Sequence, residues 1–342
     1  MRKKHPIQFQ RYEIERSPLY RLANKRKLAD LVGVELSVIA SVGKSDLTSQ
    51  YLIFKDRNTR RFITQPIKQL ALIHKHLLKL LCRIAPPEYV HSAIKNRSYK
   101  TNAEQHAAAE NVLKIDIRKF FPSVKFHYIH DFFLNSLQCS KDIATILTKL
   151  CTVRTDKYGV HLPTGSCISP LLSFLANRRL FDSVKQIAEE HGCIFTVYVD
   201  DITISGSSAT RNVLNLIAAE IHKHGYQYHK IETYHAVPAT VTGLIVSEGK
   251  VCLPFERAKR IRELRKALSL AKEKSLRSKM LASLVGRLSE AEHIDPVYKK
   301  IRAEVMAAYA TDWDEVVAYR LKKARIKRFS GMQPRRSAPQ SS

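Results

Sequence analysis

Acidic residues are scarce in this chain of 342 residues, where 31 Asp and Glu stand against 58 Lys and Arg, a formal net charge of +27. No uninterrupted apolar run approaches the roughly 18 residues that a membrane-spanning helix needs. No apolar segment of a secretory signal follows the basic N-terminus. The six cysteines include no Cys-x-x-Cys pair. We therefore expect a cytoplasmic protein with reduced thiols, and not a membrane protein, a zinc knuckle or a disulfide scaffold.

The excess of cations predicts a polyanionic partner, with nucleic acid expected first and an anionic membrane surface second. A hydrophobic fraction of 44% is typical of a globular protein with a real core. At roughly 150 residues per domain, the length predicts two or three domains. Charge and length thus indicate a class of partner, but they do not indicate a chemistry.

The first hundred residues are predicted to be helical, with one interruption by strands. Ser17-Pro18 is typical of a helix start, and we expect a basic amphipathic segment from there to Val42. Within it, residues 28–34 fit either a DNA-reading helix-turn-helix or, as we favour, an ordinary pair of packing helices. Residues 51–63 are predicted to form a hairpin with a polar turn, and residues 67–84 an amphipathic helix.

Further short β-type runs follow residue 111. A strand over 112–117 contains Asp116 near its end, and two short strands flank Asp200-Asp201, which places these acids at a hairpin turn. Another hairpin is predicted over 241–253. Beyond it the sequence is helical and strongly basic, with eight cations and no acid from 320 to 336. This last segment suits contacts with phosphates.

Three carboxylates at 116, 200 and 201 need an explanation in so basic a chain. Adjacent strands of one sheet would bring them together, and close carboxylates repel one another unless a cation neutralises them. Mg²⁺ prefers such oxygen ligands, and two ions about 3.5–4 Å apart would activate a 3′-hydroxyl and stabilise a leaving pyrophosphate. Taken singly, Asp116 is equally an ordinary strand end, and Asp200-Asp201 an ordinary polar turn.

Three segments occur in the order and at the spacing of polymerase motifs: Asp116–Val124, Leu162–Pro170 and Tyr198–Asp201. Together they resemble motifs A, B and C of reverse transcriptases, and the resemblance spans roughly residues 51–253. It implies an α+β right-hand polymerase. The regions it implies are N-terminal helices and fingers in 1–110, a palm of antiparallel sheet plus helices with inserted fingers elements and the catalytic motifs in 111–254, a basic helical thumb in 255–330 and a disordered tail in 331–342.

The resemblance also implies roles for single residues. Asp116, Asp200 and Asp201 correspond to the catalytic, metal-binding aspartates, with the Ile117 carbonyl as a candidate fourth ligand. The ions implied are two Mg²⁺, for which Mn²⁺ is a substitute. The substrates implied are dNTPs, which add to a priming hydroxyl.

Further residues match the dNTP site of the family. Phe121 falls at the steric gate, where an aromatic face clashes with a ribose 2′-hydroxyl; alternatively, it is a core aromatic. Arg61, and more loosely Lys55, match the fingers cations that hold the triphosphate, although a solvated basic hairpin would look the same. Gly165 permits close backbone approach to the templating pair, and Thr164 stands where the family usually has Gln.

Two segments resemble retron reverse transcriptases in particular. Asn102–His106 fits the Asn-Ala-x-x-His signature, although Asn-x-x-Gln is also close to a helix-capping box. Val241–Val246 fits the Val-Thr-Gly segment, although any strand with a glycine bend would look similar. Where relatives often show Asn-x-x-Lys-Thr, Glu232 occupies the lysine position, so we assign no general-acid role to Lys230.

The retron resemblance implies a cognate structured noncoding RNA of the msr-msd type, primed from a guanosine 2′-hydroxyl and copied into a branched RNA–DNA hybrid, msDNA. It also implies host ribonuclease H in processing and a separate effector protein in anti-phage defence, with no membrane partner. The RNA-binding candidates are Asn102, His106, Thr242, Gly243, Lys322, Lys323 and Arg325. His74, His76, His222 and His224 are expected at the surface or beside RNA, and not as metal ligands.

Two alternatives stay open. The chain also fits another bacterial reverse transcriptase, of a diversity-generating or abortive-infection system. A non-catalytic RNA-binding scaffold with a degenerate polymerase fold is the second alternative, and the intact Asp116, Asp200 and Asp201 argue against it.

Overall fold

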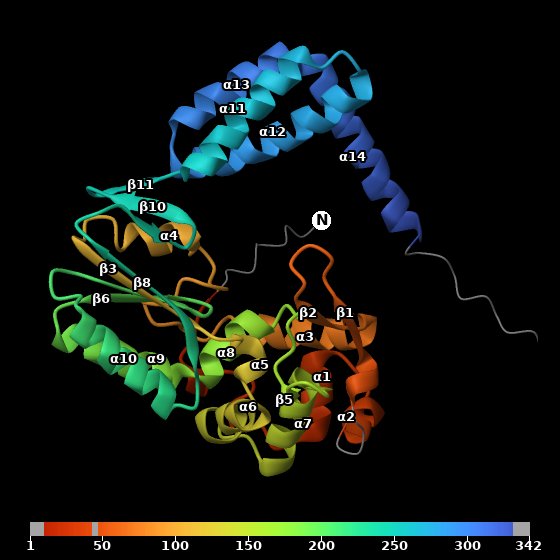
Figure 1. Ribbon diagram of the computed structural model, residues 1–342. Coiled ribbons are helices and arrows are strands. Elements are labelled where there is room, and N and C mark those ends of the chain that lie inside the picture. The colour runs from red at the N-terminus through yellow and green to blue at the C-terminus, as the bar shows by residue number, and fades with distance from the viewer. Residues whose placement is uncertain (1–9, 43–46, 331–342) are drawn as a thin grey trace, which may run out of the picture. The chain divides into compact units, whose positions relative to one another are not determined.

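The computed structural model describes residues 10–42 and 47–330 (Figure 1). The chain forms two compact units, Met1–Lys250 and Val251–Ser342. Within the described ranges, none of the helices combines the length and the apolar character that a membrane crossing requires. All six cysteines are free thiols, as expected; Cys139, Cys151 and Cys193 are buried, whereas Cys167 and Cys252 are exposed.

A four-stranded antiparallel sheet in the order β6-β7-β3-β8 forms the centre of the first unit. Its strands are β3 (Asn111–Ile117), β6 (Ile194–Tyr198), β7 (Asp201–Ser205) and β8 (Tyr228–His235). Apolar side chains of β3 and β7 are almost fully buried, among them Leu113, Ile115 and Ile204. The predicted strand around Asp116 and the hairpin around Asp200-Asp201 are confirmed.

Helices cover both faces of this sheet. α9 (Arg178–Glu190) and α10 (Arg211–Lys223) lie along one face, and α4 (Tyr99–Glu104) lies on the other, next to β10 (Figure 1). A small sheet in the order β11-β10-β9 contains the predicted hairpin over 241–253, which turns at Glu248-Gly249. Its strands are β9 (Ala239–Val241), β10 (Leu244–Ser247) and β11 (Lys250–Cys252).

The predicted N-terminal hairpin is confirmed as β1 (Tyr51–Lys55) and β2 (Phe62–Pro66), paired antiparallel. Its turn is closed by Asp56, whose Oδ1 accepts from the backbone N–H groups of Asn58 and Thr59 at 3.1 and 2.6 Å. The predicted amphipathic helix follows as α3 (Lys68–Leu81).

The predicted helix start at Ser17 is wrong. Ser17 ends a short 3₁₀ turn, η1 (Ile14–Arg16), and the first α-helix begins only after Asn24, whose side chain accepts from two backbone N–H groups. α1 (Lys25–Val32) and α2 (Leu36–Val42) are separated by Gly33 in the left-handed region. Both helices bury apolar residues in the core of the first unit, as expected of an ordinary packing pair.

The segment between the predicted motifs A and C is mostly helical, and it carries one short hairpin. Its apolar side chains join the same core as those of the sheet. The elements are α5 (Phe120–Ser123), α6 (Phe126–Asp131), the π-helical turn η3 (Phe132–Ser136), α7 (Lys141–Cys151), β4 (Val153–Thr155), β5 (Gly159–His161) and α8 (Ser169–Ala176). A last 3₁₀ turn, η2 (Leu47–Gln50), precedes β1.

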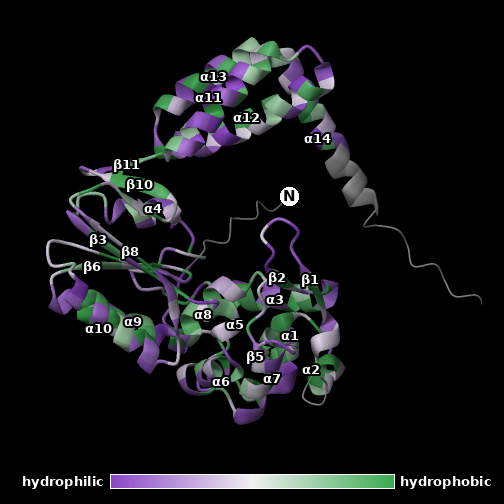
Figure 2. Cartoon of the chain, in the orientation of Figure 1, coloured by the Kyte–Doolittle hydropathy of each residue, from purple (hydrophilic) through white to green (hydrophobic). Residues whose placement is uncertain are grey.

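The described part of the second unit is helical, as predicted beyond Pro254. Its helices mix hydrophobic and hydrophilic residues along their lengths (Figure 2), and a separate core forms around Leu281, Leu284 and Leu288. Leu276, near the start of the same helix, is 45% exposed and lies outside this core. The helices are α11 (Phe255–Leu270), α12 (Lys274–Ile294), α13 (Val297–Ala308) and α14 (Ala310–Ser330). Residues 331–342, predicted to be a tail, lie outside the described residues.

Candidate active site

The structure brings the three predicted aspartates to one end of the central sheet. Asp116 in β3 is the direct partner of Asp201 in β7. Asp200 lies in the two-residue turn between β6 and β7, and its carbonyl accepts from the Ile117 N–H at 3.1 Å. The register of the sheet therefore sets the spacing of the three carboxylates.

The turn that carries Asp200 has an unusual backbone. Val199 has a φ of +63°, in the left-handed region that β-branched residues avoid. Its N–H donates to the Ser92 hydroxyl at 2.9 Å. A two-residue hairpin loop needs such a conformation to match the twist of its strands, so the strain at Val199 accompanies the placement of Asp200.

Burial and mutual repulsion act on the acids. Burial, together with the charge of Asp116, raises the pKa of Asp200 to about 6. Burial also raises the pKa of Asp201 to about 6, against the opposing charge of Lys114 and with Asp116 adding to the rise. In the part of the chain that the structure describes, no three His, Cys, Asp or Glu side chains form a complete metal site. Oxygen donors that repel one another nevertheless suit a hard divalent cation.

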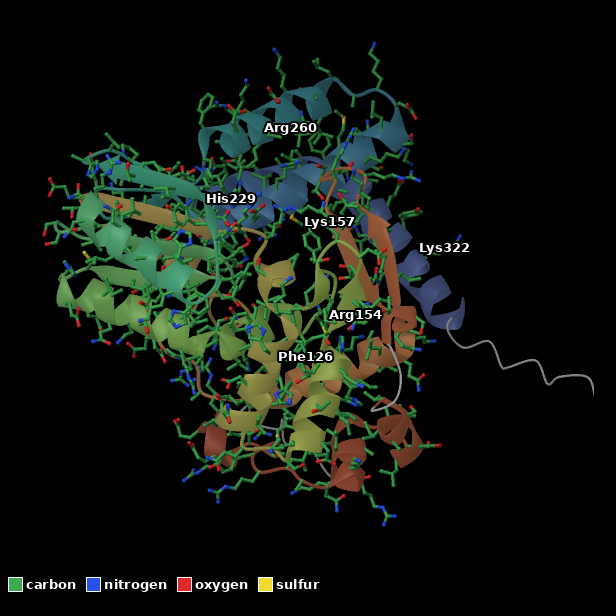
Figure 3. All side chains as sticks on the ribbon, turned by 60° about the horizontal axis from the view of Figure 1, so that its bottom comes forward. Phe126, Arg154, Lys157, His229, Arg260 and Lys322 are labelled. Carbon is green, nitrogen blue, oxygen red and sulfur yellow. The ribbon has the colours of Figure 1, made fainter. Side chains whose placement is uncertain are left out.

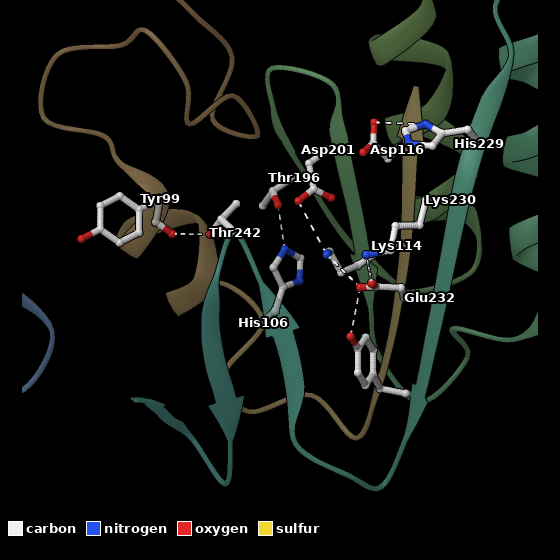
Figure 4. A network of polar contacts seen from close by, with 11 residues as sticks. Tyr99, His106, Lys114, Asp116, Thr196, Asp201, His229, Lys230, Glu232 and Thr242 are labelled. Atoms are coloured by element: carbon white, nitrogen blue, oxygen red, sulfur yellow. Dashed lines mark hydrogen bonds and ion pairs between the residues drawn. The ribbon is translucent and has the colours of Figure 1, made fainter. Parts of the chain in front are cut away.

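A polar network adjoins Asp201 (Figure 4). Lys114 Nζ lies 3.7 Å from Asp201 Oδ2 and 3.0 Å from Glu232 Oε2. Glu232 also pairs with Lys230 at 2.5 Å and accepts from the Tyr234 hydroxyl at 3.0 Å. Burial alone would raise the pKa of Glu232, but its lysine partners lower it to about 2. Glu232 thus forms ion pairs with two lysines, Lys114 and Lys230.

The aspartates line a cleft of about 1200 Å³. Most of the residues predicted for the dNTP site also line this cleft: Lys55, Arg61, Phe121 and Thr164. Ile117, the candidate fourth metal ligand, lines it as well. Phe121 is half-buried, while its neighbour Phe120 belongs to the core. The charge of Arg61 is near enough to lower the pKa of Asp200 slightly against the larger rise from burial.

Thr164 and Gly165 dock on β2. The Thr164 hydroxyl donates to the Phe62 carbonyl at 2.8 Å, and its N–H donates to Thr64 Oγ1 at 2.8 Å. Gly165 N–H donates to the Thr64 carbonyl at 3.1 Å. A Cβ on Gly165 would lie 3.0 Å from that carbonyl oxygen. The close approach predicted at Gly165 is therefore made to β2, and Gly165 does not line the cleft.

The sequence interpretation missed several residues of the cleft. β4 and β5 are each only three residues long, so they give no periodic signal. A basic-aromatic cluster ahead of Gly159, in Arg-Thr-Asp-Lys-Tyr-Gly, was the available signal. The missed cleft residues include Lys119, Arg154, Lys157, Tyr158 and His229, the last with Nδ1 3.9 Å from Asp116 Oδ1.

Burial corrects the expectation that Asn102 and His106 contact RNA, because both are fully buried. His106 bridges the two strands of the aspartate hairpin, with Nδ1 2.7 Å from Ser205 Oγ and Nε2 2.7 Å from Thr196 Oγ1. Burial lowers the pKa of His106 to about 3. The N-terminal cap of α4 is made by a capping box at Ser98, and not by Asn102.

The remaining RNA-binding candidates lie apart. Thr242 lines the cleft and donates to the Tyr99 carbonyl at 2.6 Å, followed by Gly243 at a φ of +76°. Lys322 is an exposed residue of α14. Lys323 and Arg325 lie outside the residues whose side chains are described.

The expected surface position of His74 is wrong. Its ring is fully buried, with Nδ1 2.6 Å from Ser166 Oγ and Nε2 2.7 Å from the Leu150 carbonyl, and burial lowers its pKa to about 4. His76 Nδ1 lies 2.6 Å from the Val32 carbonyl. His222 is exposed and His224 half-buried. The burial of His74 depends on partners far along the chain, Leu150 and Ser166, which no local pattern reveals.

Comparison with known proteins gives the family. The reverse transcriptase (RNA-dependent DNA polymerase) family matches residues 44–246, more than half of the chain. The retron Ec86 reverse transcriptase of Escherichia coli is 29% identical over 240 residues, 68% of each chain. The retron Se72 reverse transcriptase of Salmonella heidelberg (strain 579083-10) is 28% identical over 261 residues, 71% of this chain and 67% of the relative.

These matches confirm the predicted family and the predicted enzyme class. Reverse transcriptase domains have a right-hand polymerase fold, with which the mixed helices and sheet are compatible, and they generally use divalent metals. The chain therefore belongs to the reverse transcriptases, which are RNA-directed DNA polymerases, and its similarity is to those of the retron type.

Proposed function

We propose that this protein copies part of a cognate structured RNA into DNA, with Asp116, Asp200 and Asp201 as its catalytic carboxylates. The observation that carries the proposal is the convergence of these acids, from β3 and from the β6–β7 turn, at one end of a buried sheet and in one cleft. Three carboxylates in a chain of net charge +27 suggest a site that requires negative charge.

The acids and the Ile117 carbonyl would hold two Mg²⁺ ions, for which Mn²⁺ is the proposed substitute. When bound, such ions activate the priming hydroxyl and stabilise the leaving pyrophosphate. The protein itself positions these ligands through the β3–β7 register and the strained turn at Val199. Because Asp200 and Asp201 are half-buried, their charges are less screened by water and act more strongly on whatever occupies the cleft.

Arg61 and Lys55 are the proposed triphosphate contacts from the β1–β2 hairpin. Both line the cleft, and cations aimed at a developing phosphate charge lower the barrier of phosphoryl transfer. Phe121 is the proposed steric gate, supported by its half-buried place in the wall. Thr164 and Gly165 are proposed to act on the nucleotide indirectly, through the hydrogen bonds that dock them on β2.

The regions follow the polymerase pattern. We assign the fingers to residues 1–110, the palm with inserted fingers elements to 111–254 and the thumb to 255–330, with a tail beyond. Basic helices such as α14, which carries Lys322, Lys323 and Arg325, suit phosphate contacts with an RNA duplex. Thr242 and Gly243 are the proposed RNA contacts of the first unit.

The finer biology is proposed from the relatives. The similar proteins are named as retron reverse transcriptases. The template would be a noncoding RNA of the msr-msd type, primed from a guanosine 2′-hydroxyl and copied into msDNA. Host ribonuclease H would process the hybrid, and a separate effector would complete an anti-phage system in the cytoplasm.

The experiment pairs two double variants. Asp200→Asn with Asp201→Asn should abolish dNTP incorporation on co-purified RNA while RNA binding persists. Glu189→Gln with Glu190→Gln, an exposed acidic pair on α9, is the matched control and should leave incorporation unchanged. Undiminished extension by the first variant would refute the site. Sequencing of co-purified nucleic acid should recover a 2′-5′ branched RNA–DNA, and its absence beside active extension would favour another bacterial reverse transcriptase.

A further inference from the structure

We propose that the β4–β5 hairpin is a second phosphate-binding wall of the cleft, in which Lys157 and Lys119 bind the triphosphate of the incoming nucleotide. The inference rests on the proposed function, because it concerns the same cleft. It adds binding residues that lie between the polymerase motifs and outside the β1–β2 hairpin.

A ladder of alternating ammonium groups and aromatic rings carries the proposal. Lys157 Nζ lies 5.4 Å from the centroid of the Phe62 ring and 5.5 Å from that of Tyr158. Lys55 Nζ lies 6.0 Å from the Phe62 ring, and Lys119 Nζ lies 5.6 Å from the Tyr158 ring. The ladder joins three elements: the β1–β2 hairpin, the β4–β5 hairpin and the segment after β3.

Every member of this ladder lines the cleft that contains the aspartates. Figure 3 shows Lys157 and Arg154 on the β4–β5 hairpin, beside β1 and β2. Lys119 follows Asp116 by three residues and has a φ of +49°, which ends the strand and begins α5. The wall thus adjoins the carboxylates along the chain as well as in space.

The charges of the ladder lack acidic partners. Among the residues that the structure describes, none of Lys55, Lys119 and Lys157 forms a salt bridge with a carboxylate, although Asp156 lies in the same turn as Lys157. Three ammonium groups gathered on two rings repel one another. A cation–π contact at an exposed site is weaker than a charge-assisted hydrogen bond to phosphate, so a polyanion would draw these lysines from the rings.

The hairpin itself is firmly supported. Lys125 Nζ donates to the Tyr158 carbonyl at 2.7 Å, and Leu162 N–H donates to the Val124 carbonyl at 3.0 Å. Thr155 Oγ1 lies 3.0 Å from His161 Nε2 at the base of the strands. These bonds attach the hairpin and the residue that follows it to Val124 and Lys125, at the end of the segment that begins with Asp116, so the position of Lys157 is set relative to the aspartates before a ligand binds.

Two sources offer the required chemistry, the triphosphate of a nucleotide and the backbone phosphates of the template. The geometry favours the triphosphate, because Lys119 is only three residues from a proposed metal ligand and the reacting phosphates must lie beside that ligand. A template strand would need contacts that continue beyond the cleft, and the ladder ends within it.

The test is Lys157→Gln in the full-length protein, measured with and without catalysis. We expect the KM for dNTP to rise about tenfold, the loss of one charge-assisted contact, with kcat changed less than twofold. Inorganic tripolyphosphate, a probe without base or sugar, should inhibit the variant about tenfold more weakly than the parent. Lys119→Gln should act in the same direction, and Asp156→Asn in the opposite direction.

Lys141→Gln is the matched control, since it removes an exposed lysine at the start of α7, outside the cleft. An unchanged KM and an unchanged tripolyphosphate inhibition would overturn the proposal, and reduced RNA affinity in that case would assign the wall to the template. Calorimetric binding of tripolyphosphate needs no turnover. If the parent binds tripolyphosphate and the Lys157→Gln variant binds it more weakly, the phosphate-binding wall is supported even when neither protein extends a primer. A lack of extension would contradict only the proposed function.

Discussion

The aspartates of the cleft lie on a sheet, whereas most of its cations lie on two hairpins. Ile115, Val197 and Ile202, which neighbour the acids in β3, β6 and β7, are at most 1% exposed. In the β1–β2 hairpin, by contrast, Leu52 is 59% exposed and Phe62 is 47% exposed. The acids are thus fixed by register and burial. The cations of the β1–β2 hairpin lie on strands with exposed apolar side chains, whereas the β4–β5 hairpin buries only the residues at its base, Val153 and His161.

This difference matches what each group has to do. Carboxylates that hold metal must keep their geometry to within fractions of an ångström, and a packed sheet provides that. Cations that meet a flexible polyphosphate need an anchored backbone, and their long side chains then follow the phosphates. The two sides are joined where Thr64 and Thr164 exchange hydrogen bonds between β2 and the segment before α8.

The largest effect is expected on the sheet side. Asp116→Asn should lower the rate of primer extension by about 10³-fold, because it removes a charge that the chemistry requires. The Asp116 charge repels those of Asp200 and Asp201 and so contributes to their raised pKa values. Because Asp116→Asn relieves this repulsion, the melting temperature should not fall. Single-turnover extension and thermal unfolding measure the two effects. If Lys55→Gln lowered kcat as much as Asp116→Asn, the acids of the sheet and the cations of the hairpins would not have the different roles described above.

The next effect concerns the support of the aspartate hairpin. His106→Ala removes two buried hydrogen bonds and leaves a cavity, and we expect the free energy of unfolding to fall by about 3 kcal/mol at pH 7. His293→Ala, at an exposed residue of α12, is the control and should change it by less than about 0.5 kcal/mol. Denaturant titration at pH 7 measures both, and equal effects would show that His106 does not brace the strands.

Stability should also depend on pH through the same ring. The pKa of His106 is about 3 and that of His74 about 4, both lowered first by burial. As the pH falls below about 6.5, the unfolded chain binds protons that these buried rings do not bind. Each histidine should therefore cost about 2 kcal/mol of stability at pH 5 relative to pH 7.5. His106→Ala should remove its share of that slope, and an unchanged slope would contradict the assignment.

Much of the sheet side was predictable from the sequence. The run around Asp116 and the apolar strands beside Asp200-Asp201 have the pattern of buried strands, and the motif spacing supplied their likeness to a polymerase. The sequence indicated that adjacent strands bring Asp116 and Asp201 together, but it did not give their register. Register depends on residues far apart in the chain. Ser169-Pro170 indicated a helix start and Gly192 a helix end, and α8 and α9 occupy that stretch. The break at Asn177 between the two helices and the four-residue helix α5 gave no comparable signal.

The hairpin side was predictable only in part. Residues 51–63 carry a polar turn between apolar runs, so the β1–β2 hairpin was found. The β4–β5 hairpin has strands too short for periodicity, so Lys157 and Arg154 were missed. His74 and His106 were misjudged because their burial depends on tertiary partners, Ser166 and Leu150 for one and Thr196 and Ser205 for the other. No local pattern reveals such partners.

A smaller effect is expected where the two sides meet. Gly165→Ala would bring a Cβ to within 2.9 Å of Ile63 Cγ2 and 3.0 Å of the Thr64 carbonyl oxygen, so β2 must shift. We expect kcat/KM for dNTP to fall by about 10- to 100-fold, because the hairpin that carries Arg61 is displaced. Gly286→Ala in α12, where no atom lies within 4 Å, is the control and should leave kinetics unchanged. Unaltered kinetics in Gly165→Ala would mean that the hairpin adapts freely.

The smallest effect is expected at Glu232, on the sheet but beside the acids. Glu232→Gln removes the carboxylate that lies 3.0 Å from Lys114 Nζ, which leaves Asp201 as the nearest acid to that ammonium group. A cation that pairs more strongly with Asp201 competes with a divalent ion for the same oxygens. We expect the Mg²⁺ concentration for half-maximal extension to rise about threefold, with little change in kcat at saturating Mg²⁺.

Tyr234→Phe is the matched control, because it removes one hydrogen bond from Glu232 but keeps the charge that attracts Lys114. Its Mg²⁺ requirement should equal that of the parent. A threefold rise in both variants would mean that β8 acts through its packing and not through charge. A rise in Glu232→Gln alone would show that Glu232 weakens the pairing of Lys114 with Asp201. The Mg²⁺ requirement would then depend on how Lys114 is shared between these two acids of the sheet.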